Sequence, residues 1–100
     1  MRNKLIKIIN MKMSRNEPFK GLENATGIKA KKWSHMYNGR TQPSAEMIEA
    51  IGKLFPEYAY WLITGKTIPE HGQTSPDLEQ LAELQRSIGH TDHEHTEEQA

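Results

Sequence analysis

The chain of 100 residues carries 13 Lys and Arg against 13 Asp and Glu, and 35% hydrophobic residues can close only one small core, which argues against a two-domain enzyme. Because cysteine is absent, a disulfide framework, a thiolate metal site and a cysteine nucleophile are excluded. No apolar run approaches the roughly 20 residues of a spanning helix, and no signal-peptide core is present, so we expect a soluble, cytoplasmic protein without a membrane partner.

Two helices are predicted before the first glycine turn. Helical spacing predicts a helix over residues 2–13, with lysines between its apolar residues Leu5, Ile8, Ile9 and Met13. Asn16 is expected to cap the next helix, which tolerates Pro18 only in its first turn. This second helix has a short apolar face and ends at Gly27, a residue able to take a positive φ.

Three further helices are predicted from the same helical spacing of apolar residues. The third covers residues 29–38, with Trp33 on its inner face, and Asn38-Gly39 stops it. Ser44 is expected to cap a fourth helix that ends at Pro56, and a fifth short helix ends at Gly65. The larger aromatic residues are expected in the core, namely Trp33, Trp61, Tyr58 and Phe55.

The composition changes after residue 66, which closes the predicted domain of residues 1–66. Residues 67–76 have the proline, glycine, threonine and serine content of a linker, and Ser75 begins a C-terminal helix over residues 77–88. Because residues 89–100 are polar and acidic without apolar residues for a core, we expect them to be disordered. The C-terminal helix carries a narrow apolar stripe of Leu78, Leu81, Ala82, Leu84 and Ile88.

Charge is divided unequally along the chain. Residues 1–66 hold twelve basic and five acidic side chains, a sum of +7, whereas residues 67–100 hold one basic and eight acidic side chains, a sum of −7. The net charge of zero is therefore the sum of a basic segment and an acidic segment of equal magnitude. A basic domain of this kind favours a polyanionic partner, although a solvated lysine-rich surface is the alternative.

The second and third predicted helices form the most informative feature, because they are short, meet at Gly27, and the later one is rich in lysine. This arrangement is typical of a helix-turn-helix. With about 100° per residue and Trp33 facing inward, the opposite face of the third helix is polar and basic. We therefore expect DNA contacts from that face, its first turn and the loop after it, namely Lys29, Ala30, Lys31, Lys32, Ser34, His35, Asn38 and Arg40.

The stretch GLENATGIKAKKWSHMYNGRTQP, with the later WLITGK, resembles the lambda-repressor-like (Cro/C1, Xre-type) helix-turn-helix DNA-binding family over residues 2–66. Gly27, Ile28 and Trp33 match the family's turn glycine and its two apolar positions. The resemblance implies a compact five-helix domain that binds operator DNA, usually as a homodimer, and regulates transcription.

Three positions depart from the family pattern. Glu23 stands where the family usually has an alanine, no capping residue stands near Lys29, and Phe19 replaces a glutamine that usually opens the first helix of the motif. A buried, unpaired carboxylate would cost several kcal/mol. Glu23 is therefore expected to turn to the surface or to pair with a lysine, unless the register of the motif differs.

Together these observations predict an all-α transcriptional regulator, a repressor, that inserts residues 29–38 into the major groove of double-stranded DNA as a homodimer. Dimerisation is expected through the fifth helix or through the C-terminal stripe. The alternative is an antitoxin or adaptor whose main partner is a protein bound by the C-terminal helix. As a further hypothesis, the acidic segment of residues 67–100 competes with DNA for the basic face.

No motif for catalysis is present, so the chain is not expected to be an enzyme and no cofactor is expected. His90, His93 and His95 could suggest a metal site, but no apolar residues would hold them in a fixed tetrahedral arrangement. A disordered tail without metal is therefore the favoured interpretation of these histidines.

Overall fold

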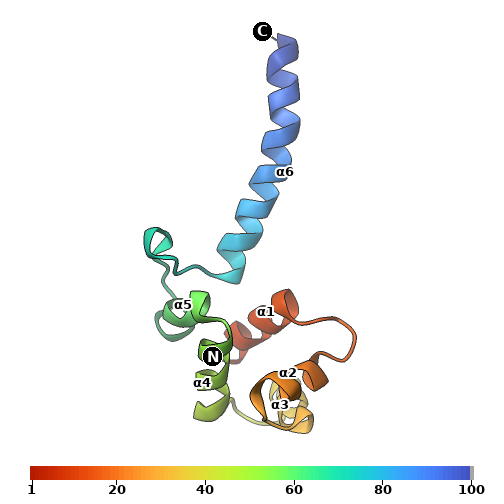
Figure 1. Cartoon of the computed structure of the whole chain (residues 1–100), viewed down its shortest axis with the longest axis vertical. Helices are drawn as coiled ribbons and strands as arrows, with labels where there is room; N and C mark the ends of the chain where they lie inside the picture. The colour runs from red at the N-terminus through yellow and green to blue at the C-terminus, as the bar shows by residue number, and fades with distance from the viewer. Residues whose placement is uncertain (100) are drawn as a thin grey trace.

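The computed structural model describes the backbone of residues 1–99 and the side chains of residues 1–87. Within this part the chain is all-helical, apart from one isolated antiparallel bridge between Ile68 and Gln73. Figure 1 shows that the helices before residue 66 form one globule, from which the last helix projects. The elements are α1 (Arg2–Lys12), α2 (Pro18–Thr26), α3 (Ala30–Tyr37), α4 (Ala45–Leu54), the 3-10 turn η1 (Pro56–Tyr58), α5 (Ala59–Thr64), the 3-10 turn η2 (Pro69–His71) and α6 (Pro76–Gln99).

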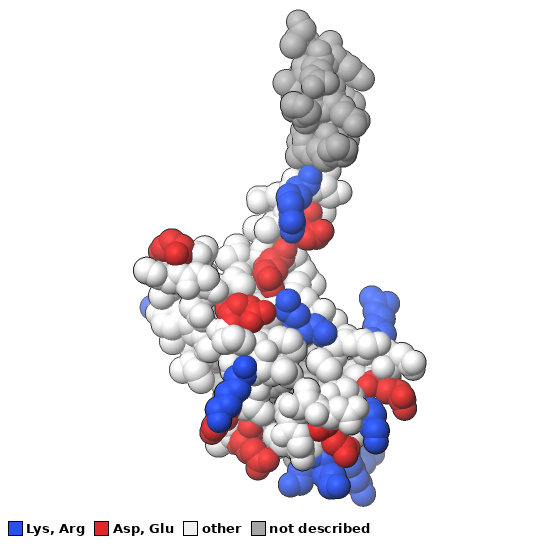
Figure 2. All heavy atoms as spheres, in the orientation of Figure 1, with Lys and Arg blue, Asp and Glu red and all other residues white. Residues whose placement is uncertain are grey.

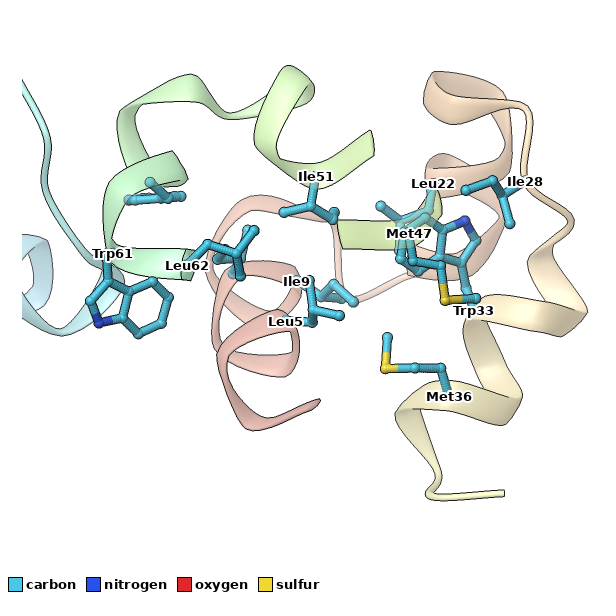
Figure 3. Packing of buried hydrophobic residues seen from close by; sticks show 12 residues of the cluster. Leu5, Ile9, Leu22, Ile28, Trp33, Met36, Met47, Ile51, Trp61 and Leu62 are labelled. Carbon is cyan, nitrogen blue, oxygen red and sulfur yellow. The ribbon is translucent and has the colours of Figure 1, made fainter. Parts of the chain in front are cut away.

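One apolar cluster joins α1 to α5. Figure 3 shows Trp33 of α3 beside Leu22 and Ile28, while Leu5 and Ile9 of α1 lie between these residues and α5. Each helix contributes one face, as the helical spacing predicts, and each fully buried aliphatic side chain adds roughly 1.5–3 kcal/mol of stability. The buried cluster consists of Leu5, Ile8, Ile9, Leu22, Ile28, Trp33, Met36, Met47, Ile51, Tyr58, Trp61 and Leu62.

Helix ends confirm most of the expected boundary signals. Gly27 and Gly65 end α2 and α5 with φ of 80° and 78°, values that favour glycine because an added Cβ would be strained. The Ser44 hydroxyl accepts the Met47 amide at 3.1 Å, as expected for its cap position. The predicted cap at Asn16 is wrong: Pro18 is the first helical residue, which makes Glu17, directly before it, the N-cap of α2.

Residues 67–76, which have the composition of a linker, are held against the domain. Gln73 accepts the Tyr60 amide at 3.0 Å and donates to the Pro56 carbonyl at 3.1 Å. The Thr74 amide bonds to the Glu57 carbonyl at 2.8 Å. These hydrogen bonds fix the point from which α6 leaves the globule.

The start of α6 is buried, whereas its continuation is not. The Ser75 hydroxyl accepts the Leu78 amide at 3.0 Å, which confirms the predicted cap, and Pro76 is fully buried. The Tyr58 hydroxyl donates to the Glu79 carboxylate, and burial raises the pKa of this tyrosine. Leu81 and Leu84 are 49% and 56% exposed, so the apolar stripe does not dock on the domain beyond Leu78.

The C-terminal helix is longer than the sequence predicts. Its backbone continues beyond residue 88 to Gln99, through a segment that lacks proline, and the expected disorder of residues 89–100 is not confirmed. The side chains from residue 88 onward lie outside the described part of the chain. Among the described residues, no helix is long and apolar enough to span a membrane.

We expect a chain that ends at Lys66 to unfold with a free energy about 2 kcal/mol lower than a chain that ends at Ser87. The shorter chain loses the buried Pro76 and the hydrogen bonds of Gln73, whereas the longer one keeps both. Urea denaturation followed by circular dichroism measures the difference. The full-length protein is the control and should match the chain ending at Ser87; equal stability of all three would contradict the anchoring role of residues 67–76.

Candidate nucleic-acid interface

The helix α3 buries one narrow face and leaves its other residues half-buried or exposed. Trp33 and Met36 are fully buried, and the residues opposite them face solvent. Figure 2 shows lysine and arginine side chains gathered at the bottom of the view, where Figure 1 places α2 and α3. Of the predicted DNA-contacting set, the structure leaves Lys29, Lys31, Lys32, Asn38 and Arg40 exposed and Ala30, Ser34 and His35 half-buried.

The predicted residues lie along one short stretch of backbone. Lys29 is the N-cap of α3, Asn38 is its C-cap, and Arg40 follows in the loop. The Asn38 amide group donates to the Ser34 hydroxyl at 3.3 Å, and the Arg40 backbone amide bonds to the His35 carbonyl at 2.8 Å. The structure therefore places these residues along α3 and at its two ends, with Lys31, Lys32 and Asn38 exposed and Ala30 half-buried.

Four basic side chains at this helix form no ion pair within residues 1–87, although the Glu23 carboxylate interacts electrostatically with Lys29. Ion pairs in that range involve other lysines and arginines, and none involves the α3 face. Uncompensated positive charge on an exposed surface attracts polyanions. The four residues are Lys29, Lys31, Lys32 and Arg40.

The N-terminus of α3 is capped from another helix. Lys29 makes no side-chain cap, but the Glu23 carboxylate, from α2, accepts the Ala30 amide at 2.9 Å. This hydrogen bond lowers the pKa of Glu23, an effect that Lys20 and Lys29 reinforce against partial desolvation. Two of the departures from the family pattern are therefore linked, because Glu23 supplies the cap that no residue near Lys29 provides.

The C-terminus of α3 is held by α1. The Arg2 guanidinium donates from Nε to the Met36 carbonyl at 3.0 Å and from Nη2 to the Thr41 carbonyl at 3.0 Å. A cation at this end of a helix also interacts favourably with the macrodipole. Sequence reasoning missed Arg2, since its acceptors are backbone groups and leave no signal in the residue pattern.

A third attachment holds the last turn of α3. The Tyr37 hydroxyl donates to the Asn10 side-chain oxygen at 2.7 Å, and the Phe19 ring meets the Tyr37 ring edge-on with centroids 5.3 Å apart. Phe19, the third departure from the family pattern, therefore contributes an aromatic contact between α2 and α3. The orientation of α3 is fixed by contacts at both ends and on its inner face.

The lysines of α1 belong to a different surface. Lys4 donates to the Leu62 carbonyl at 3.2 Å, near the C-terminus of α5. Lys7 pairs with Asp77 at 2.8 Å, and Lys12 lies 3.7 Å from Glu57. These three cations are engaged on the side of α5 and α6, and they do not add to the basic face of α3.

Within the described residues, no group of three or more histidine, aspartate or glutamate side chains could hold a metal ion. His90, His93 and His95 lie outside the residues whose side chains are described.

Comparisons with known proteins give a likeness among solved structures. No protein-family model matches the chain, and no curated protein matches it. Among solved structures, the chain is similar to Pf6r from the filamentous phage Pf6 of Pseudomonas aeruginosa PA01, with a TM-score of 0.66 and 28% sequence identity. The match covers 77% of this chain and 95% of that one, so the likeness extends over most of the fold.

The Glu23 cap predicts a pH dependence of stability. Because the pKa of Glu23 is lowered in the folded protein, its contribution is present above the ordinary value of 4.5 and is lost as the pH falls through the lowered folded value. We expect wild type to have a higher Tm than Glu23→Gln near pH 7. The gap should shrink below about pH 4. Thermal unfolding of both proteins between these pH values measures it, and a gap of constant size would show that the charge does not contribute.

Proposed function

We propose that this chain is a sequence-specific double-stranded DNA-binding regulator of transcription, acting as a repressor, with a helix-turn-helix of the lambda-repressor-like type formed by α2 and α3. The observation that supports it most directly is an exposed face of α3 whose basic residues form no ion pair within residues 1–87 while the helix itself is fixed at both ends. A rigid helix with a polar outer face is the element that enters a major groove in such modules. The Pf6r likeness supports the arrangement of the helices.

The proposal gives the residues of α3 different tasks. Lys29, Lys31 and Asn38 would contact base edges, where lysine favours guanine and asparagine favours adenine. Lys32, Ser34 and Arg40 would contact phosphates, which set register and affinity without reading sequence. His35 and Ala30, both half-buried, complete the proposed contact set.

The dimer included in this proposal needs an apolar surface away from α3, and two surfaces qualify. One lies between α4 and α5, where Ile63 is 67% exposed beside a shallow apolar groove lined by Ala45, Ile48, Gly52, Ala59 and Leu62. The other is the Leu81 and Leu84 stripe on α6. We favour the α4–α5 surface, because its small residues allow close approach of a second copy and it belongs to the rigid domain that carries α3.

The exposed stripe of α6 favours a second function, that of an adaptor for a protein partner. Leu81 and Leu84 face solvent on a helix that leaves the globule, as Figure 1 shows. An amphipathic helix of this kind fits an apolar groove of another protein. This role is compatible with DNA binding, because α6 departs from the end of the globule opposite to α3.

Lys31→Ala is expected to weaken binding to DNA selected from a random pool by roughly tenfold, because it removes a contact in the groove. Lys7→Ala is a matched control that removes the same charge from a lysine already paired with Asp77, so its affinity should stay close to wild type. Fluorescence anisotropy across a range of salt concentrations measures both. A wild-type affinity indifferent to salt, or equal losses in the two variants, would contradict the proposed function.

Ile63→Glu is expected to convert the protein from dimer to monomer and to weaken binding to a site with two half-sites by about tenfold or more, since each half-site is then bound separately. Leu84→Glu is the matched control, with the same kind of substitution at an exposed apolar residue of α6. Sedimentation velocity measures the oligomeric state. Dissociation by Leu84→Glu but not by Ile63→Glu would assign the interface to α6 instead.

A further inference from the structure

The two ends of α3 are bonded by opposite charges that come from two other helices. At the N-terminus the Glu23 carboxylate of α2 accepts the Ala30 amide, and at the C-terminus the Arg2 guanidinium of α1 donates to the Met36 and Thr41 carbonyls. The signs match the helix macrodipole at both ends. The turn before α3 offers no side-chain cap, since Lys29 makes none, whereas the loop after it also bonds the C-terminus, where the Gly39 amide donates to the Met36 carbonyl at 3.2 Å.

We propose that Glu23 and Arg2 form a charged clamp of positioning residues that holds α3 in the orientation needed to discriminate operator from random DNA. This inference rests on the proposed function and deepens it by naming residues that act through α3 and not through DNA. Its consequence is that discrimination depends on two side chains outside the predicted DNA-contacting set.

The need for a clamp follows from the length of α3. Eight residues are too few to form a stable helix alone, and most of the main-chain donors and acceptors of so short a helix lie in its end turns. The inner face of α3 is fixed by Trp33 and Met36, and the hydrogen bond from Tyr37 to Asn10 adds to Arg2 at the C-terminus, so the start of α3 depends most on Glu23. A small tilt would displace Lys29 and Asn38, at opposite ends, in opposite directions.

Glu23 accepts two hydrogen bonds, one from each side of the turn, and so holds the start of α3 against the end of α2. Its backbone carbonyl accepts the Gly27 amide at 2.8 Å, and its carboxylate accepts the Ala30 amide at 2.9 Å. The residue therefore ties the end of α2 and the start of α3 to one point. The carboxylate also lowers the positive potential near Lys20 and Lys29, which makes random DNA a poorer ligand.

Position and charge can be separated by two substitutions of Glu23. Glu23→Gln keeps the reach and an acceptor oxygen but removes the charge, whereas Glu23→Asp keeps the charge but is one methylene too short for the Ala30 amide. Glu83→Gln is the control and should change neither readout, since Glu83 is an exposed glutamate of α6 that pairs with Arg86 on the same helix. Arg2→Lys tests the other end, because lysine keeps the charge without the two-pronged geometry of arginine.

The readouts are the dissociation constants for the DNA selected by wild type and for random DNA, and the hydrogen exchange rate of the Ala30 amide in the free protein. We expect Glu23→Asp to weaken selected-DNA binding roughly five- to tenfold and to accelerate Ala30 exchange by a similar factor. Glu23→Gln should keep selected-DNA affinity within about twofold while random DNA binds more tightly. Arg2→Lys should weaken selected DNA by roughly fivefold and leave random DNA unchanged.

Contrary results have distinct meanings. A wild type that does not prefer its selected DNA overturns the proposed function, and the clamp's role in discrimination falls with it. If wild type discriminates but Glu23→Asp discriminates equally well, or if Glu23→Gln loses as much as Glu23→Asp, the clamp is overturned alone. Should Arg2→Ala lower the salt dependence of random-DNA binding by about one phosphate contact, Arg2 is a DNA ligand and not a positioning residue.

Discussion

The structure depends on contacts that stabilise α3, a helix too short to be stable alone. Eight residues of α3 bury only Trp33 and Met36 in full, and an isolated helix of that length does not persist in water. Contacts with α1 and α2 therefore stabilise it, through the buried cluster and through hydrogen bonds at both ends. Because those contacts use only the inner face and the termini, the outer face of α3 is left free for a ligand.

Local signals in the sequence predicted much of this arrangement. Periodic apolar residues located the first five helices, and glycine at positions that need a positive φ located the ends of α2 and α5. Ser44 and Ser75 were identified as caps because their acceptors lie three residues away in the chain. Long-range polar contacts could not be predicted in this way, since Arg2 bonds a carbonyl 34 residues distant and nothing in its neighbourhood specifies that partner.

Glu23 shows the intermediate case, in which the sequence revealed a conflict without its resolution. A carboxylate at a helix-crossing position is unfavourable when it is buried without a partner. The Ala30 amide lies only seven residues away, but the carboxylate reaches it because the turn at Gly27 folds α3 back toward α2. The same departure that weakens the match to a family pattern therefore supplies this chain with a cap that its own turn lacks.

In the folded chain, several of the charges that sum to zero are paired with neighbouring opposite charges. Basic residues of α1 are neutralised locally, since Lys7 pairs with Asp77 at the base of α6 and Lys12 lies beside Glu57. Glu83 of α6 pairs with Arg86 on the same helix. Competition between the acidic segment and DNA would require acidic groups near α3, yet α6 leaves the globule at the opposite end. Within residues 1–87 the ion pairs lie on α1, α4, η1 and α6, and none involves the exposed lysines Lys31 and Lys32 of α3, whose charge remains available to a polyanion.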